Sequence, residues 1–244
     1  MPLYTLACMY TAGSGGETVQ SLGDRTYRTL KWSVLVGDFG LGERLGEERL
    51  AALVGASRTP VREALLRLHA EGLVDRLPDG GYTPSVPDLP AVSELYEVRM
   101  ALELEALRRP EATRTPHDRR MIETLHATWL GYRAAPPEPD PAFVIADEGF
   151  HITLAAAAGN ACLVEFLRMV NERIRSVRMR DFLTPERIAV TIGEHLGILE
   201  PVLGGDVTTA AARLRTHLLG SMDIVRRRAA GALQRMAARD HGRS

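Results

Sequence analysis

Four side chains that commonly bind metals occur in the second half of this sequence, where helical patterns prevail. Asp147 and His151 are spaced i,i+4, so both lie on one face of a helix. His195 and His217 fall on the last two helical patterns, and all four residues lie in or beside apolar stripes. Three imidazoles and a carboxylate facing a bundle interior could bind zinc, nickel or manganese and leave coordination positions for the oxygens of a ligand. Each histidine could also be an ordinary buried, hydrogen-bonded residue.

Arg99 is a charged residue within an apolar stripe. It continues the stripe of Leu95 and Leu102 on a helix expected over residues 91–109, so it points into the bundle. A guanidinium in that position needs an anionic partner, because an unpaired buried charge is costly. Glu103 or another internal acid could supply it.

A second group of polar residues opens the segment ASRTPVREALLRL, which begins at Ala56. Arg58 and Arg62 project together from a face beside its apolar stripe. The first residues of a recognition helix contact bases in the major groove, where arginine can donate two hydrogen bonds to guanine. Ser57, Thr59 and the backbone amides at the helix start suit phosphate oxygens. The alternative is that both arginines lie on a solvated face without binding anything.

The elements around this segment predict a small DNA-binding fold. Helical patterns cover residues 22–36 and 47–54 before it, and extended runs at 73–77 and 82–86 follow it. The runs are separated by Pro78-Asp79-Gly80-Gly81, which is typical of a hairpin turn. Three helices and a hairpin indicate a winged helix-turn-helix over residues 21–86.

The rest of the chain is predicted to be helical, so the expected fold class is mainly α: an N-terminal winged helix-turn-helix with a small β-hairpin and a C-terminal all-α antiparallel bundle. Residues 87–90 read as a linker, and residues 1–20 and 231–244 as tails. The bundle, residues 91–230, is expected to contain helices at 91–109, 116–133, 141–158, 161–182, 185–204 and 206–230.

Composition excludes several classes of protein. Among 244 residues there are two cysteines, Cys8 and Cys162, without the spacing of a disulfide framework or a thiolate zinc site. No segment is apolar enough to span a membrane or act as a signal peptide, so we expect a cytoplasmic protein. The net charge of −1 does not indicate nucleic-acid binding, which must depend on local placement of charge.

The N-terminal half resembles the DNA-binding domain of GntR-type bacterial transcription regulators, and the following helical domain makes the FadR subgroup the best match. The residues that carry the resemblance are Gly42-Glu43-Arg44-Leu45, Leu50-Ala51, Ser57-Arg58-Thr59-Pro60-Val61-Arg62-Glu63-Ala64-Leu65, Leu68 and Glu71-Gly72-Leu73-Val74.

The resemblance implies a role for each DNA-contacting residue. Arg58 and Arg62 would read bases, Ser57 and Thr59 would hold phosphates, and the wing glycines would approach the minor groove; these are Gly80 and Gly81. Two positions depart from the family pattern. Leu41-Gly42 replaces the usual Pro-Gly, and Glu48 stands where the fatty-acid-responsive relative has a further DNA-contacting arginine.

The helical half resembles the FCD ligand-binding domain of the same subgroup, on Glu97-Val98-Arg99, Asp147-Glu148-Gly149-Phe150-His151, Glu194-His195-Leu196, Gly205-Asp206 and Leu214-Arg215-Thr216-His217-Leu218. In metal-binding members these positions imply a divalent metal, zinc above nickel or manganese, bound by Asp147, His151, His195 and His217. They also imply that Arg99 binds the carboxylate of an effector.

The sequence therefore predicts a ligand-responsive transcription regulator rather than an enzyme. We expect a homodimer that represses by binding a palindromic operator in double-stranded DNA, with a small carboxylate metabolite as effector and no membrane partner. A metal-dependent enzyme is the alternative from another class, but no further acid or histidine stands out as a general base. A direct metal sensor using the same Asp/His cluster is a third interpretation.

Overall fold

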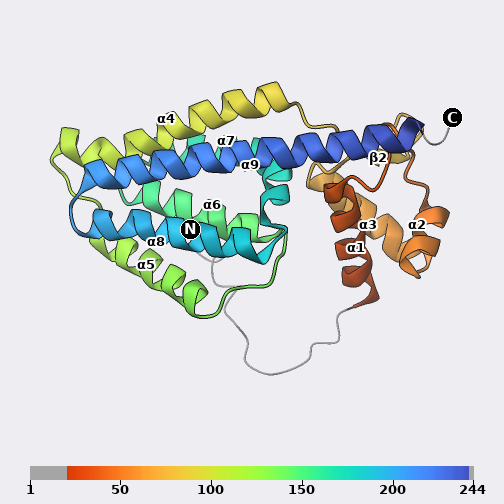
Figure 1. Cartoon of the computed structure of the whole chain (residues 1–244), viewed down its shortest axis with the longest axis horizontal. Coiled ribbons are helices and arrows are strands. Elements are labelled where there is room, and N and C mark those ends of the chain that lie inside the picture. Colours follow the sequence, from red (N-terminus) through yellow and green to blue (C-terminus); the bar gives the residue numbers. More distant parts are fainter. Residues whose placement is uncertain (1–20, 242–244) are drawn as a thin grey trace.

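The computed structural model describes residues 21–241, and it shows a winged helix-turn-helix followed by a helical domain (Figure 1). The tails predicted at residues 1–20 and 242–244 lie outside the described residues. The N-terminal elements are α1 (Leu22–Val36), α2 (Glu47–Val54), α3 (Arg58–Ala70), β1 (Val74–Arg76) and β2 (Tyr82–Pro84).

The winged helix has a small core beneath α3. The apolar side of α3 is buried against α1, led by Val61, Leu65 and Leu68. The strands pair antiparallel with Asp75 opposite Thr83, and both are shorter than the runs predicted at 73–77 and 82–86. The hairpin is nevertheless where the sequence placed it, because its turn residues lie between two short extended segments.

The second domain is built entirely from helices within the described residues, and its apolar side chains form a core between them. None of the helices in residues 21–241 is long and apolar enough to cross a membrane. The elements are α4 (Leu89–Thr113), α5 (Arg119–Ala134), α6 (Phe143–Ala156), α7 (Ala161–Arg178), the 3₁₀ helix η2 (Met179–Phe182), α8 (Pro185–Leu203) and α9 (Val207–His241).

The linker predicted at residues 87–90 is shorter in the structure. Asp88 caps α4 by accepting a hydrogen bond from Ala91 N at 3.1 Å, and Leu89 and Pro90 are already helical. Proline suits the first turn of a helix because its missing N–H has no partner there. The helical domain therefore begins almost directly after the wing.

The C-terminal tail predicted from residue 231 is wrong for residues 231–241, which continue α9. Figure 1 shows this helix, in blue, running from the helical domain across to α1. Ala232 and Met236 are buried, and Arg235 Nε donates a hydrogen bond to Val36 O at 2.5 Å. Contact with the winged helix thus stabilises the helical turns that follow residue 230.

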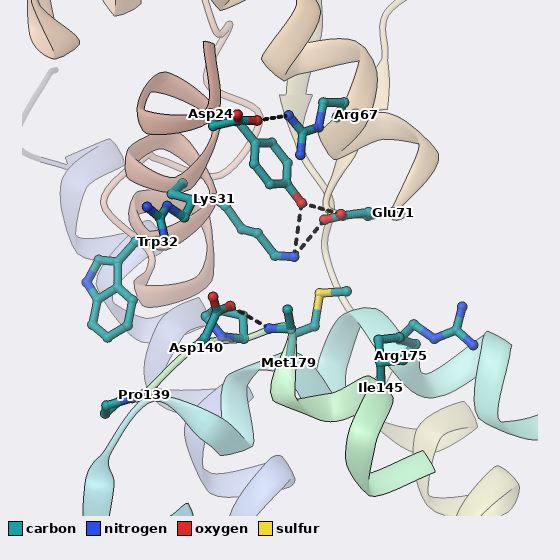
Figure 2. Close-up of a pocket in the computed structure, with 14 residues that line it drawn as sticks. Asp24, Lys31, Trp32, Arg67, Glu71, Pro139, Asp140, Ile145, Arg175 and Met179 are labelled. Atoms are coloured by element: carbon teal, nitrogen blue, oxygen red, sulfur yellow. Dashed lines mark hydrogen bonds and ion pairs between the residues drawn. The ribbon is translucent and has the colours of Figure 1, made fainter. Parts of the chain in front are cut away.

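A pocket of about 670 Å³ separates α1 and α3 from the start of α6 and the end of α7 (Figure 2). Several of its charged side chains are already paired. Lys31 Nζ lies 3.0 Å from Glu71 Oε2 and 3.1 Å from the Tyr27 hydroxyl, which itself donates to Glu71. Arg67 pairs with Asp24 across the mouth of the same pocket.

A substitution at Gly37 tests the contact between α1 and α9. Its φ is +80°, and an added Cβ would lie 2.6 Å from Ala232 O, whereas Gly55 has a φ of +64° and nothing within 4 Å. We expect Gly55→Ala to cost about 1–2 kcal/mol of unfolding free energy from left-handed backbone strain alone. Gly37→Ala should cost about 1–3 kcal/mol more, because α9 must shift. Urea unfolding measures both, and equal losses would show that α9 does not pack there.

Candidate metal centre, effector pocket and DNA-reading surface

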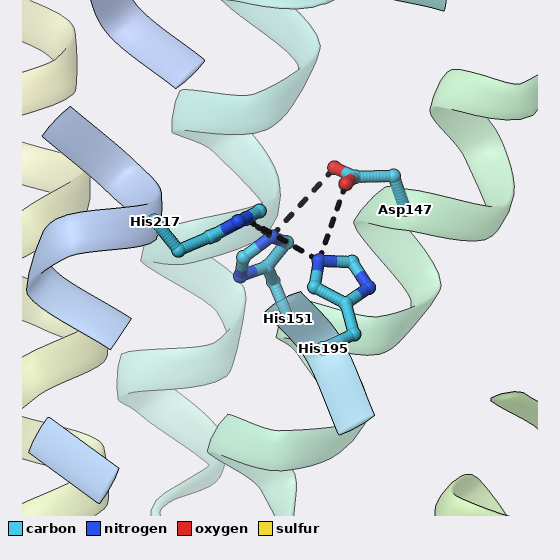
Figure 3. Close-up of side chains that lie close together, drawn as sticks. All are labelled: Asp147, His151, His195 and His217. Carbon is cyan, nitrogen blue, oxygen red and sulfur yellow. Dashed lines mark hydrogen bonds and ion pairs between the residues drawn. The ribbon is translucent and has the colours of Figure 1, made fainter. Parts of the chain in front are cut away.

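The four predicted metal ligands converge in the core of the helical domain. Asp147 and His151 come from α6, His195 from α8 and His217 from α9, and all four are buried (Figure 3). One ligand atom from each lies within 4.8 Å of the others. The Nε2 atom of His217 is 3.3 Å from the Nε2 atoms of both other imidazoles, and His195 Nε2 is 3.4 Å from Asp147 Oδ1.

Carboxylates orient two of the imidazoles. His151 Nδ1 lies 2.5 Å from Glu103 Oε2, and His217 Nδ1 lies 2.9 Å from Glu194 Oε2. Burial opposes the charge on Glu103, but His151 and Arg99 lower its pKa to about 2. An ionised carboxylate only accepts hydrogen bonds, so each Nδ1 must be the donor. An imidazole whose only ring proton is on Nδ1 has a lone pair on Nε2, so the Nε2 atoms of these two rings are placed to act as ligand atoms.

The third imidazole is held by aromatic rings instead. His195 stacks on Phe150 with centroids 3.6 Å apart, and the edge of Trp129 approaches at 4.2 Å. Its Nδ1 is buried without a hydrogen-bond partner among the described residues. Burial lowers the pKa of His195 well below its usual range and lowers that of His151 to about 4. These two rings are therefore neutral near pH 7 and able to act as ligands.

The donor set fits a divalent metal. A tetrahedral ion with ligand distances of about 2.0–2.1 Å brings neighbouring ligand atoms to about 3.3–3.4 Å of one another. The Nε2 contacts of His217 at 3.3 Å therefore agree with the spacing of neighbouring ligand atoms around such an ion. Arg178 pairs with Asp147 and, although burial opposes it, holds the pKa of that carboxyl below its usual range.

Arg99 occupies the position that the sequence predicted and has two kinds of contact. Its side chain is fully buried, and Nε donates to Glu103 Oε1 at 2.6 Å, so the internal acid is a partner. Both terminal nitrogens, Nη1 and Nη2, are buried without a hydrogen-bond acceptor within residues 21–241. Since Glu103 also contacts His151, one carboxylate links the free end of Arg99 to the metal ligands.

Two polar residues on α7 were missed by sequence reasoning. Arg178 Nε and Nη1 and both amide atoms of Asn171 are buried without hydrogen-bond partners in the described chain. The two residues are spaced i,i+7 and so share a face of α7, which packs against the helix of Arg99. That spacing was the available signal, but an arginine and an asparagine in one stripe also occur on solvated faces.

The predicted base-reading arginines lie at the start of α3, where Ser57 is the N-cap. Arg58 and Arg62 are exposed and share one acid of α2. Arg62 donates to both oxygens of Glu47 at 2.9 Å, and Arg58 Nε lies 3.3 Å from Glu47 Oε2. The hydrogen bond from Arg62 is the main reason why the pKa of Glu47 is lowered. Glu47 thus orients both guanidinium groups, a contact that helix periodicity alone does not reveal.

The remaining predicted DNA contacts surround these arginines. The Ser57 side chain makes no capping hydrogen bond in the described structure, and Thr59 is exposed beside it. Gly80, with a φ of +86°, and Gly81 lie in the wing turn. Arg44 reaches this turn and pairs with Asp79, which places a positive charge at the wing that sequence reasoning did not assign.

Comparison with known proteins agrees with both halves of this architecture. Residues 22–83 match the family described as bacterial regulatory proteins, gntR family, and residues 94–220 match the FCD domain. A structure titled for Lar, which controls the expression of the Listeria monocytogenes agr system, has a TM-score of 0.58 at 19% identity. It covers 85% of this chain and 98% of that one. At this level of identity, the similarity shows that the two proteins share a fold.

Curated relatives align over most of the chain. An HTH-type transcriptional regulator from an unstable DNA locus of Streptomyces ambofaciens is 30% identical over 204 residues, covering 82% of this chain and 84% of the relative. The Nta operon transcriptional regulator of Aminobacter aminovorans is 29% identical, covering 83% and 93%. These families and relatives are transcription regulators and not enzymes. The chain therefore belongs to the gntR family of bacterial regulatory proteins and is a DNA-binding regulator of transcription with a C-terminal FCD domain.

Proposed function

We propose that the helical domain binds a divalent metal and a small carboxylate metabolite, and that the metabolite controls operator binding. The observation that carries this proposal is the set of facing Nε2 atoms at 3.3 Å, with two Nδ1 atoms held by carboxylates. Asp147, His151, His195 and His217 would hold the ion, with zinc the first candidate and nickel or manganese next. When bound, the metal supplies a positive centre for oxygens of the effector.

Arg99 would bind the effector carboxylate. Its two free terminal nitrogens form a planar pair of donors, which matches the two oxygens of a carboxylate. Arg178 Nε and the side-chain amide of Asn171 present further atoms without partners on the adjoining α7, suited to hydroxyl or carbonyl groups of the ligand. A bound acid would satisfy donors that are otherwise buried at a cost.

In this proposal, α9 transmits effector binding to the DNA-binding domain. This helix carries His217, one of the proposed metal ligands. Its C-terminal part packs against the end of α1, at Val36 and Gly37. A ligand that changes the position of His217 therefore acts on a helix that also touches the winged helix. It alters DNA affinity only by binding two domain arrangements with different strength.

We also propose that the protein is a homodimer that acts as a repressor on a palindromic operator. An exposed apolar group on adjacent α4 and α7 is a suitable interface: Val98, Phe166 and Met169. Glu94 and Glu97 are exposed on α4 and Arg168 on α7, so a two-fold contact can pair opposite charges. A dimer that covers a palindrome excludes other proteins from overlapping promoter DNA.

DNA reading by α3 is tested with a duplex selected from a random pool by the wild-type protein. We expect Arg62→Ala to weaken binding by about 1–3 kcal/mol, because one bidentate contact to guanine is lost. Fluorescence anisotropy at moderate salt measures this. Arg67→Ala is the control, because Arg67 lies on the same helix but pairs with Asp24; equal affinity of Arg62→Ala and wild type would refute the assignment.

Fluorescence anisotropy also tests whether the protein binds DNA as a dimer. A duplex with one half-site should bind more weakly than the palindrome, and Phe166→Glu should reduce palindrome affinity toward the half-site value, because it places a charge in the proposed interface. Identical binding to both duplexes would contradict a dimeric reader.

Metal binding is tested by removing one ligand. We expect one divalent ion per wild-type chain after dialysis, and stabilisation of about 2.7 kcal/mol when free metal is a hundredfold above Kd. His217→Ala should lose most of the ion and this stabilisation, whereas His126→Ala, on α5 outside the cluster, should keep both. Mass spectrometry of metal content and thermal unfolding measure these effects. Metal content that is the same in His217→Ala as in wild type would show that the cluster is not the site.

The effector class is tested by thermal unfolding against hydroxy acids, dicarboxylates, sugar acids and acyl-coenzyme A. We expect one class of carboxylate to stabilise the metal-loaded protein, and the effect to vanish on chelation and in Arg99→Gln. Arg108→Gln, an exposed change on the same helix, should respond like wild type. Stabilisation by metal alone, with no active acid, would instead favour the ion itself as the signal.

A further inference from the structure

A second, smaller pocket of about 290 Å³ lies where the winged helix meets the helical domain. The winged helix contributes the turn after α3 at Gly72 and the segment at Ser85 that follows β2. The helical domain contributes the first turns of α4, the end of α7 and Arg180 of η2. The pocket is separate from the metal ligands, none of which lines it.

Arg180 is the unusual residue of this pocket. It is 4% exposed, and its Nε has no hydrogen-bond partner among the described residues. Its Nη1 donates a hydrogen bond to Ser176 O at 3.2 Å. Burial lowers the pKa of Arg180 to about 10, with no carboxylate opposing that effect. The acid next in sequence, Asp181, is bonded to Arg187 instead.

Buried arginines are normally matched by an anion, as Arg99 and Arg178 are in this domain. The charged side chains of the larger pocket are mostly paired, so Arg180 stands out. Its backbone is fixed by Arg228, whose Nη1 donates to Arg180 O at 2.8 Å. The backbone of Arg180 is thus held in place, while its Nε has no hydrogen-bond acceptor among the described residues.

Other donors converge on the same space. The hydroxyl of Ser85 is buried without a partner in the described chain, and Arg173 and Ser176 also line the pocket. Of the two acids in the lining, Asp88 already caps α4 and Asp75 is exposed. Two guanidinium groups and two hydroxyls offer more hydrogen-bond donors than one carboxylate accepts, whereas a phosphate group has oxygens enough to accept from several of them.

We propose that this hinge pocket binds a phosphate group, with Arg180 and the Ser85 hydroxyl as its central donors. The group could be free phosphate or the end of a small phosphomonoester, since both present the same oxygens. Ser85 belongs to the winged helix and Arg180 to the helical domain, so the bound anion joins the two domains directly. It would therefore favour one domain arrangement independently of the metal centre.

The test is thermal unfolding of the full-length protein with inorganic phosphate and with glycerol 3-phosphate, at constant ionic strength set by sodium chloride. We expect a concentration-dependent rise in Tm of several degrees for wild type. Arg180→Met should fold with a Tm at or above that of wild type without phosphate, because a buried charge lacking an acid is removed. It should show no phosphate response.

Ser85→Ala provides a second variant in case Arg180→Met does not fold. The Ser85 hydroxyl bonds to nothing in the described structure, so its removal should leave Tm without phosphate nearly unchanged. Loss of a hydrogen bond to a charged ligand should weaken phosphate binding about tenfold or more, measured by isothermal titration calorimetry. Arg108→Gln is the control, since this exposed arginine of α4 lies outside the pocket.

The outcomes separate this site from other anion sites. A response that persists after chelation and in Arg62→Ala excludes the metal centre and the recognition helix as its source. Stronger stabilisation by the ester than by phosphate would assign a phosphorylated metabolite, and the reverse would assign the free anion. Equal responses of wild type, Arg180→Met and Ser85→Ala, or no response of wild type to either probe, would overturn the proposal.

Discussion

Buried charge is the constraint around which the helical domain is organised. A buried charge needs an opposite charge or a ligand as its partner. Burying it unpaired costs more free energy than most single contacts contribute to stability. Arg99 and His151 share Glu103, and Arg178 pairs with Asp147, so these contacts connect α4, α6 and α7. The terminal nitrogens of Arg99 and the Nε of Arg178 remain without hydrogen-bond partners in the described chain, and the proposed effector site rests on them.

The proposed metal ligands lie on α6, α8 and α9, and side chains from neighbouring helices hold their imidazoles in place. Glu103 on α4 and Glu194 on α8 fix which ring nitrogen of His151 and His217 faces the centre. Phe150 and Trp129 fix the plane of His195 by stacking and edge contact. The surrounding groups thus hold the three imidazoles in place, which would reduce the reorganisation needed to bind the proposed metal.

Several features were predictable because they are local. The i,i+4 spacing of Asp147 and His151, the inward position of Arg99 and the two exposed arginines of α3 follow from helical periodicity. Turn residues located the hairpin for the same reason. The end of α9 was misplaced because residues 231–241 are kept helical by packing against α1, a contact with no local signature.

The sequence by itself determined which residues share a helix face, and hence the fold class, since side-chain periodicity and turn chemistry act over a few residues. Its motifs also carried the resemblance to the family. Only the tertiary structure decided that Asp147 and His151 meet His195 and His217 at ligand distances. It also decided that Glu47 contacts both arginines predicted to read bases, and that Arg180 is buried without an acid in the described chain. Those contacts join residues far apart in sequence, and their distances depend on how whole helices pack.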